Sequence, residues 1–217
     1  MDNLITRIGE GDYAEFERLI QQMLKQLTPK LDFTPARFNP RPDSPPEQPC
    51  GEPTPDTYLG YSRGDRLANR GGYQQLTSAW YRPESGLAAD QFDLSGHWLA
   101  APENLQAESP AVDNPDRMRI RYRARSVYLV AGSESGRTFA VTVSQDGHPI
   151  DPASRGSDLK TSPDGQTYLP ITETRLYYPI ESRGFGEHVL TLQIDRPGGL
   201  LYFLSFGGGC EPASDRN

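Results

Sequence analysis

Residues 117–124 read RMRIRYRA, and this strict alternation of charged and apolar side chains decides the fold class. Successive side chains of a β-strand point to opposite faces, so the arginines and the apolar residues lie on different sides. The apolar face comprises Met118, Ile120, Tyr122 and Ala124, and the charged face comprises Arg117, Arg119, Arg121 and Arg123. The stretch predicts a strand with one face in a core, followed by a second strand over residues 126–131.

Similar patterns extend from residue 57 to residue 206, with no helical periodicity between them. Further strands are expected over residues 57–61, 73–81, 94–100, 138–145, 167–170, 172–178, 188–195 and 200–206. Asp146-Gly147 predicts a tight turn, because glycine readily adopts positive φ. Residues 200–206 are apolar on both faces, as expected of a central strand. The fold class predicted is all-β: an antiparallel β-sandwich of the jelly-roll type.

The N-terminal part of the chain has a different pattern. A short strand is expected over residues 4–8, and Asp12 then has the spacing to cap a helix, with Glu15 three residues on. Apolar residues at helical spacing predict one α-helix over residues 13–27. Nine prolines between residues 28 and 56 predict an extended linker. We expect a strand-plus-helix segment at 1–28, a Pro-rich linker at 29–56, a β-sandwich at 57–210 and a flexible tail at 211–217.

The amino-acid composition limits the classes of function that the chain can have. The chain has 217 residues and a formal net charge of −7, which argues against a nucleic-acid partner because such proteins need a basic surface. No apolar stretch is long enough to predict a membrane span. The start Met1-Asp2-Asn3 is polar and acidic, unlike a signal peptide. If the protein acts outside the cytoplasm, we expect the exporting segment to lie outside this chain.

Some of the aromatic residues are candidates for binding carbohydrate, because sugar rings present an apolar C–H face that stacks on tryptophan or tyrosine. The candidates are Trp80, Tyr81, Trp98, Tyr177 and Tyr178, with Arg175, Asp93 and Asn69 as polar contacts. The alternative for each aromatic residue is a place in the core. Tyr177 and Tyr178 are the best pair, because neighbouring strand residues face opposite ways and one of them must leave the core side.

The arginines of residues 117–125 allow two interpretations. They are suited to receive an acidic partner or a sugar acid, since the guanidinium group presents a planar fork to carboxylates. The interpretation that we favour is an outer sheet face balanced by aspartate and glutamate on neighbouring strands.

Cys50 and Cys210 are the two cysteines of the chain. They are not a CxxC pair, so the sequence contains no dithiol redox motif. A disulfide that joins the two ends of the sandwich and a pair of free thiols remain alternatives. His97, His148 and His188 are scattered, so spacing predicts no metal site and no cofactor.

The sequence contains no convincing catalytic motif. The run Gly132-Ser133-Glu134-Ser135-Gly136 lies between two strands and not before a helix, so we interpret it as a hairpin loop and not as a hydrolase motif. A glycosidase needs two carboxylates at a set separation, which sequence spacing does not predict.

Several stretches together resemble DipZ-type thioredoxin-family proteins. Residues 8–13 and the helix from Phe16 to Leu24 are similar to the last strand and helix of their thioredoxin-like domain. The remainder is similar to their C-terminal module over residues 54–61, 94–98, 121–130, 175–177 and 202–207. The start of that module, Thr54-Pro55-Asp56-Thr57-Tyr58-Leu59-Gly60-Tyr61, is the most specific part.

The resemblance implies an extracytoplasmic thiol–disulfide protein. In that family a membrane-embedded electron-transfer domain and a thioredoxin-like domain precede a C-terminal sandwich similar to carbohydrate-binding modules. This chain carries no CxxC, so no catalytic residue is transferred to it, and oxidoreductase activity would reside in a separate CxxC domain.

The function expected is a non-catalytic accessory or binding module of a thiol–disulfide system. Its expected partners are a carbohydrate or acidic ligand and a thioredoxin-like domain or protein. The alternatives are a redox protein that uses Cys50 and Cys210, and a structural domain that positions a partner. Since a helix of this length is marginal alone, residues 13–27 are expected to dock or to form a homo-oligomer.

Overall fold

The structure is a computed structural model that describes residues 20–22, 24–25, 51–108 and 115–208. The chain divides into two compact units, residues 1–46 and 47–217. In the first unit, residues 20–22 and 24–25 are helical, as predicted, and Ile20 and Leu24 are exposed. The remainder of the predicted helix and the strand over residues 4–8 lie outside the described residues.

The second unit is an antiparallel β domain. Its elements are β1 (Thr57–Tyr58), β2 (Ser78–Tyr81), β3 (Phe92–Ala100), β4 (Leu105–Ala107), β5 (Asp116–Ser133), β6 (Phe139–Gln145), β7 (His148–Pro149), the 3₁₀ helix η1 (Pro152–Ser154), β8 (Lys160–Thr161), β9 (Thr167–Ile171), β10 (Arg175–Ile194) and β11 (Gly199–Gly207). Every pairing between these strands is antiparallel. The predicted all-β class is confirmed, and the strand order is compatible with a jelly roll.

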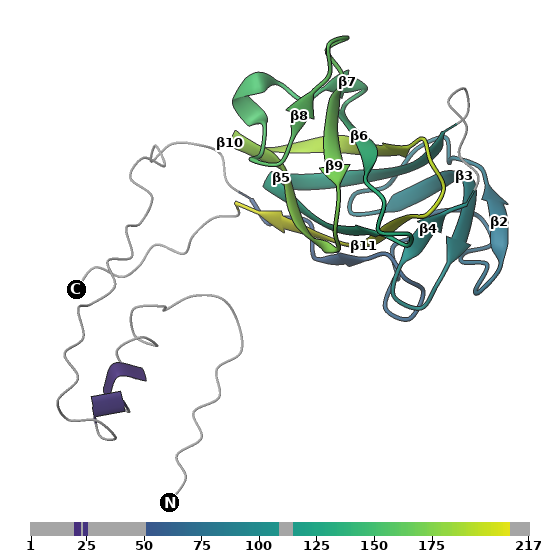
Figure 1. Ribbon diagram of the computed structural model, residues 1–217, viewed down its shortest axis with the longest axis horizontal. Coiled ribbons are helices and arrows are strands. Elements are labelled where there is room, and N and C mark those ends of the chain that lie inside the picture. The colour runs from purple at the N-terminus through teal and green to yellow at the C-terminus, as the bar shows by residue number, and fades with distance from the viewer. Residues whose placement is uncertain (1–19, 23, 26–50, 109–114, 209–217) are drawn as a thin grey trace, which may run out of the picture. The chain divides into compact units, whose positions relative to one another are not determined.

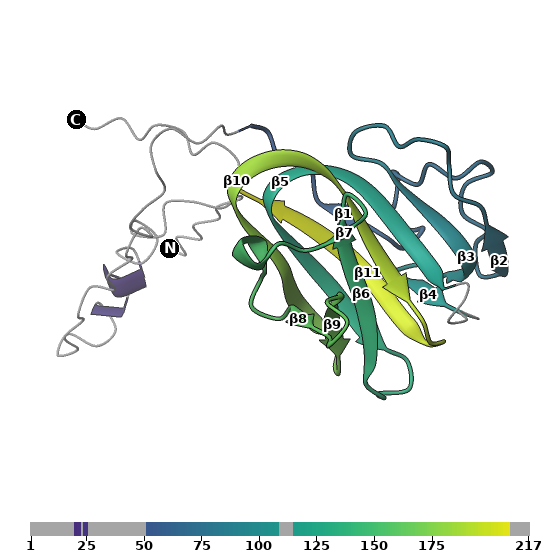
Figure 2. The ribbon, with the colours of Figure 1, turned by 90° about the horizontal axis from the view of Figure 1, so that it is seen from above.

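Two long strands organise the domain. β5 and β10 pair along most of their length and curve together, as Figures 1 and 2 show. The sequence predicts each of them as two shorter strands, and this boundary is wrong. Register shifts between Tyr177 and Ile180 and between Glu181 and Gly186 place extra residues in β10, which lets the ribbon bend without ending.

The pairings on one side of the ribbon close into a ring. The first half of β5 pairs with β3, β3 with β4, β4 with β11, and β11 pairs with the second half of β5. On the other side β10 is followed by β6, β9 and β8. Closure leaves few open strand edges, which protects a sheet against unwanted pairing.

The core follows the predicted alternation. Met118, Ile120, Tyr122 and Ala124 are buried, while the arginines between them are only partly covered. The turn at Asp146-Gly147 is also confirmed, since both residues have positive φ, 52° and 80°, and join β6 to β7.

The loop at Gly132–Gly136 does not form a hairpin. It joins β5 to β6, but β10 lies between these two strands in the sheet. The segment therefore crosses over the neighbouring strand, and the prediction of a local hairpin is wrong.

Candidate ligand-binding face

The arginines on the first half of β5 are paired. Arg119 Nε lies 3.0 Å from Asp93 Oδ1, Arg121 Nε lies 2.9 Å from Glu187 Oε1, and Arg123 Nη2 lies 3.1 Å from Asp90 Oδ2. Arg117 donates to the side chain of Gln193 at 3.1 Å. Asp93 comes from β3 and Glu187 from β10, the two strands beside β5. The predicted balance by acids on neighbouring strands is confirmed.

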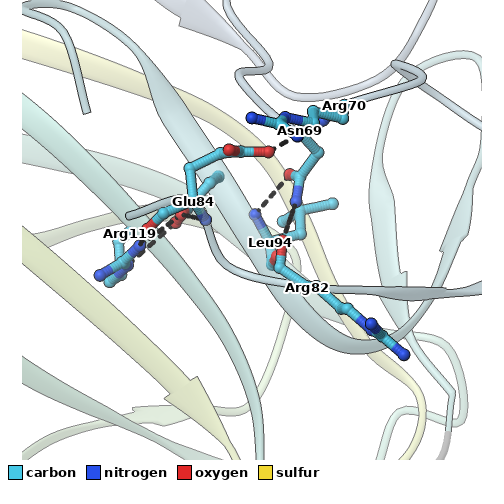
Figure 3. Close-up of polar contacts among 7 residues, drawn as sticks. Asn69, Arg70, Arg82, Glu84, Leu94 and Arg119 are labelled. Atoms are coloured by element: carbon cyan, nitrogen blue, oxygen red, sulfur yellow. Dashed lines mark hydrogen bonds and ion pairs between the residues drawn. The ribbon is translucent and has the colours of Figure 1, made fainter. Parts of the chain in front are cut away.

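Asp93 is the centre of a polar network that holds the segment after β2 against the sheet. Its carboxylate is 1% exposed and accepts hydrogen bonds from Arg119 and from the Glu84 amide, the latter at 2.8 Å. The carbonyl of Glu84 accepts a bond from Arg119 Nη2 at 2.8 Å, and these contacts appear in Figure 3. The hydrogen bond to Asp93 raises the pKa of Arg119. Asp93 is thus occupied within the protein.

Asn69 is occupied in the same way. Its side-chain oxygen accepts from the Leu94 amide at 2.7 Å, and its amino group donates to the carbonyls of Leu94 and Arg82 at 2.9 and 2.8 Å. The Glu84 carboxylate accepts from the Arg70 amide at 3.0 Å. These bonds satisfy buried groups, so neither Asn69 nor Asp93 is directed at a ligand.

A groove of about 420 Å³ lies beside this network. Its lining residues are Gly86, Leu87, Arg119, Arg121, Asp146, Glu187, His188 and Val189. The polar side chains in the groove already contact one another: Arg121 pairs with Glu187, and His188 Nδ1 lies 2.7 Å from Asp146 Oδ2. No aromatic ring of a tryptophan, tyrosine or phenylalanine lines it. The groove therefore suits a sugar or an anion poorly.

Three of the predicted ligand aromatics belong to the core. Trp98 and Tyr177 are fully buried and Tyr81 nearly so. Their polar atoms have partners: Trp98 Nε1 donates to the Ser95 carbonyl at 3.0 Å, and the Tyr177 hydroxyl donates to the Glu173 carbonyl at 2.8 Å. They leave no ring face for a ligand.

Trp80 and Tyr178 are exposed, at 65% and 42%. Trp80 stacks on His97, with ring centroids 4.9 Å apart. Tyr178 meets Tyr128 edge to face, with centroids 5.5 Å apart. The two exposed rings do not form one site, since Trp80 stands on β2, which pairs with β3, while Tyr178 stands on β10. The prediction that Tyr177 and Tyr178 face opposite ways is confirmed.

Arg175, the predicted polar contact, is held on the same strand as Tyr178. Its guanidinium group lies 3.8 Å above the Tyr177 ring and pairs with Asp158 at 2.8 Å. The hydrogen bond from Arg175 lowers the pKa of Asp158, and the Tyr178 amide adds to this effect. Arg175 is paired in register with buried Ala131, on the side of the strand that Tyr177 occupies, while Leu176 between them belongs to a face that the sequence did not single out.

That face is a row of side chains across four strands, which we call the outer row. Tyr58 of β1 pairs with Phe203 of β11, Phe203 with Val130 of β5, and Val130 with Leu176 of β10. All four are partly or largely exposed. The next row along the same strands is Thr57, Leu204, Leu129 and Tyr177, and all of its members are buried. The outer row thus lies on the opposite face of these strands from a layer of core side chains.

A β-bulge adds a further ring to the outer row. The register of β11 against β5 shifts between Leu201 and Phe203, so Tyr202 and Phe203 are both partly exposed. A hollow of about 320 Å³ lies here, lined by Tyr58, Arg63, Glu103, Val130, Tyr202 and Phe203. The rings of Tyr58 and Phe203 are 4.9 Å apart and tilted.

Polar groups surround the hollow. The Arg63 guanidinium lies 3.8 Å above the Tyr58 ring and 3.3 Å from Glu103, and both charged side chains are more than half exposed. Beyond Phe203, Ser205 donates to Asp56 at 2.7 Å. Aromatic faces with hydrogen-bonding groups beside them form an arrangement that can hold a polar ligand with an apolar side.

The sequence contains a partial signal of this face. Residues 200–206 are apolar on both sides, which we interpret in the sequence as a doubly covered central strand. β11 is indeed central, but Tyr202 and Phe203 are only partly buried. Apolar residues on the outward positions of β5, at Tyr128 and Val130, give the same signal.

Cys50 and Cys210 lie outside the described residues, so the disulfide remains a prediction. Among the described residues, no group of three histidine, cysteine, aspartate or glutamate side chains is placed to hold a metal ion. No helix in the described part of the chain is long and apolar enough to cross a membrane.

Comparison with known proteins identifies the β domain. Protein DipZ of Mycobacterium bovis and Protein DipZ of Mycobacterium tuberculosis are each 29% identical to this chain over 143 residues. The match covers 66% of this chain and 19% of each relative, so the chain spans about a fifth of the length of these proteins. The family model described as "Thioredoxin like C-terminal domain" matches residues 54–207, which is most of the chain and nearly the whole β domain. The chain therefore belongs to the thioredoxin-like C-terminal domain family.

Proposed function

We propose that this domain is a non-catalytic accessory module of extracytoplasmic thioredoxin-like thiol–disulfide proteins, and that it binds carbohydrate on the outer row. Membership of the thioredoxin-like C-terminal family and the similarity to DipZ support the accessory role. The chain itself has no CxxC pair, because its two cysteines stand at positions 50 and 210. Thiol chemistry would therefore be supplied by a separate domain or protein.

The hollow at Tyr58, Tyr202 and Phe203 is the observation that carries the proposal of a binding function. Burying aromatic surface is favourable, yet three rings at this hollow are only partly buried. Their positions in the strand ladder make them a fixed surface and not a mobile loop. A fixed aromatic surface lowers the entropic cost of holding a ligand.

Carbohydrate is the ligand class that fits the chemistry of this hollow. The C–H face of a sugar ring packs on an aromatic ring, and its hydroxyl groups need hydrogen-bond partners at the edge. Arg63, Glu103, Asp56 and Ser205 supply donors and acceptors beside the rings. Arg119 and Arg121 are paired with carboxylates of the protein itself. This pairing disfavours the alternative of an acidic ligand in the groove.

A glycan array probed with the full chain tests the proposal. We expect binding to a subset of the glycans, lost by at least tenfold in Phe203→Ala, since the ring in the hollow is removed and tenfold is about 1.4 kcal/mol. Trp80→Ala is the control, because it removes an even more exposed ring from β2 and leaves the outer row intact. No binding across the array, or equal loss in both variants, contradicts the proposal.

A structural role is the second candidate, and the aliphatic half of the outer row favours it. Val130 and Leu176 offer apolar surface without ring faces, which is typical of contacts between proteins. In that case the domain positions a thioredoxin-like partner and binds no sugar. A negative glycan array, with association of a separately produced thioredoxin-like domain that Leu176→Asp abolishes, would favour this role.

A further inference from the structure

We propose that Cys50 and Cys210 form a disulfide that joins the two ends of the β domain and stabilises it. Both cysteines lie outside the described residues, but residues close to them are described. Gly51 directly follows Cys50, and Gly208 stands two residues before Cys210. The contacts of these two glycines bring the two flanks to one place in the fold. The disulfide is independent of a ligand on the outer row.

The N-terminal flank is fixed at the bend of the β5–β10 ribbon. The Thr54 amide donates to the Arg123 carbonyl at 2.8 Å, and the Thr54 hydroxyl accepts from the Arg123 amide at 2.8 Å. Thr54 is buried, so water does not compete for this contact. Three residues earlier, a Cβ at Gly51 would lie 2.7 Å from Phe185 Cε1. The chain therefore enters the domain against β5 and β10.

The C-terminal flank leaves the domain at the same bend. Gly207, the last residue of β11, pairs with Ser126 of β5. A Cβ at Gly208 would lie 2.4 Å from the Cβ of Arg125, so the leaving chain passes directly over β5. Figures 1 and 2 show the first residues of the domain and the end of β11 at the same end of the sheet.

The two contact points are adjacent in the sheet. The register of β10 against β5 shifts between Glu181 and Gly186, opposite residues 124–126. Phe185, the contact of the entering chain, thus lies in the bulge opposite Arg125, the contact of the leaving chain. One irregularity of the ribbon receives both flanks.

β1 and β11 lead the two flanks to this bend side by side. Thr57 pairs with Leu204 in an antiparallel ladder, and the Ser205 hydroxyl donates to the Asp56 carboxylate at 2.7 Å. In an antiparallel pair, backward steps along one strand and forward steps along the other lead in the same direction. The two cysteines stand at nearly equal numbers of residues from this pair, one before β1 and one after β11.

The remaining chain is long enough for the bond. Consecutive Cα atoms are about 3.8 Å apart, so Cys50 lies that close to Gly51, and Cys210 lies within about 7.6 Å of the last described residue. Arg123 and Arg125, beside which the flanks are held, are two residues apart, or about 7 Å. A disulfide needs the two Cα atoms within about 7 Å. The sulfur atoms can therefore meet without movement of a strand.

Formation of the bond requires a disulfide oxidant, such as a thiol–disulfide protein or oxidised glutathione. The thiolate of one cysteine attacks the oxidant disulfide, which gives a mixed disulfide and one oxidant thiolate. The thiolate of the other cysteine then attacks the mixed disulfide and releases the second oxidant thiolate. One S–S bond breaks and one forms, two electrons pass to the oxidant, and the two thiol protons end on the oxidant sulfurs.

The test is a thiol count on the full chain after exposure to oxidised glutathione and denaturation without reductant. We expect the two thiols to be lost with a mass decrease of two hydrogens, in a protein that stays monomeric. Digestion without reductant should yield one linked pair of peptides that contains Cys50 and Cys210. Two free thiols, a glutathione adduct on each cysteine, or a disulfide between two copies of the chain would overturn the proposal.

Thermal unfolding tests the stabilising role. A bond that closes a loop of this size restricts the unfolded chain strongly, so reduction should lower the unfolding midpoint of the oxidised protein by about 5 to 10 °C. The matched controls are Cys50→Ser, Cys210→Ser and the double variant, each expected at the midpoint of the reduced protein and insensitive to reductant. Equal midpoints of the oxidised and reduced protein would contradict this role of the bond.

Discussion

The two halves of β5 carry the same alternation of side chains but have different outer faces. In the first half, the outward arginines are paired with Asp93, Glu187 and Asp90. In the second half, the outward residues Tyr128 and Val130 have aromatic and aliphatic neighbours and no covering element within the described residues. The comparison teaches that the charges of the first face are balanced within the domain, whereas the second face keeps apolar side chains partly exposed.

The largest expected effect separates the inward and outward sides of the second half. Leu129→Ala removes a fully buried side chain and should lower the free energy of unfolding by about 3 kcal/mol. Val130→Ala, at the next position, should cost about 1 kcal/mol or less, because the side chain is only partly buried. Urea unfolding of the two variants measures the difference. Similar costs would mean that the outer row is also a core layer.

A smaller effect is expected in the first half. Arg119→Ala leaves the buried carboxylate of Asp93 without its cation, which should cost about 2 to 3 kcal/mol, a little below the usual range because Arg119 itself is partly exposed. Arg63→Ala is the control, since the exposed pair with Glu103 should contribute about 1 kcal/mol at most. Thermal and urea unfolding at neutral pH measure both variants. A loss no larger for Arg119 than for Arg63 would show that the network does not hold the face together.

The smallest expected effect concerns the ion pair between Arg175 and Asp158. The hydrogen bond from Arg175 lowers the pKa of Asp158, so the folded domain favours the ionised carboxylate. This contribution is present above the usual aspartate pKa of about 3.9 and is lost as the pH falls through the lowered value.

Asp158→Asn should therefore reduce stability slightly at pH 6 and flatten the decline in stability below about pH 4. Because both side chains of the pair remain partly exposed, solvent screens the pair and the difference should be small. Unfolding midpoints of the full chain at a series of pH values give the two curves. Parallel acid declines in the two proteins would exclude Asp158 as a contributor.

The local rules of strands predict much of this fold. The arginine alternation of β5, the turn at Asp146-Gly147 and the opposite directions of Tyr177 and Tyr178 all depend on neighbours in sequence, and the structure confirms each of them. Local sequence patterns do not predict which strands pair when the strands are far apart in the chain. The sequence therefore predicts a hairpin at Gly132–Gly136, where β10 in fact separates β5 from β6.

The candidate site was harder to predict for the same reason. Tyr58, Phe203, Val130 and Leu176 come from four strands, and only the register brings them into one row. Residue type alone does not distinguish a core face from an exposed one. Trp98 and Trp80, for example, look alike in the sequence but differ completely in burial. The bulge that exposes both Tyr202 and Phe203 has no signature in the local pattern.

The most direct test of the central claim is a nuclear magnetic resonance titration of the isotope-labelled full chain with β-1,4-linked tetrasaccharides of glucose, N-acetylglucosamine and xylose. We predict that amide shifts change in a band across β1, β11, β5 and β10, at residues 58, 128–130, 176–178 and 202–205. Changes confined to the arginine groove or to Trp80 and His97, or no change with any of the three sugars, would contradict the account.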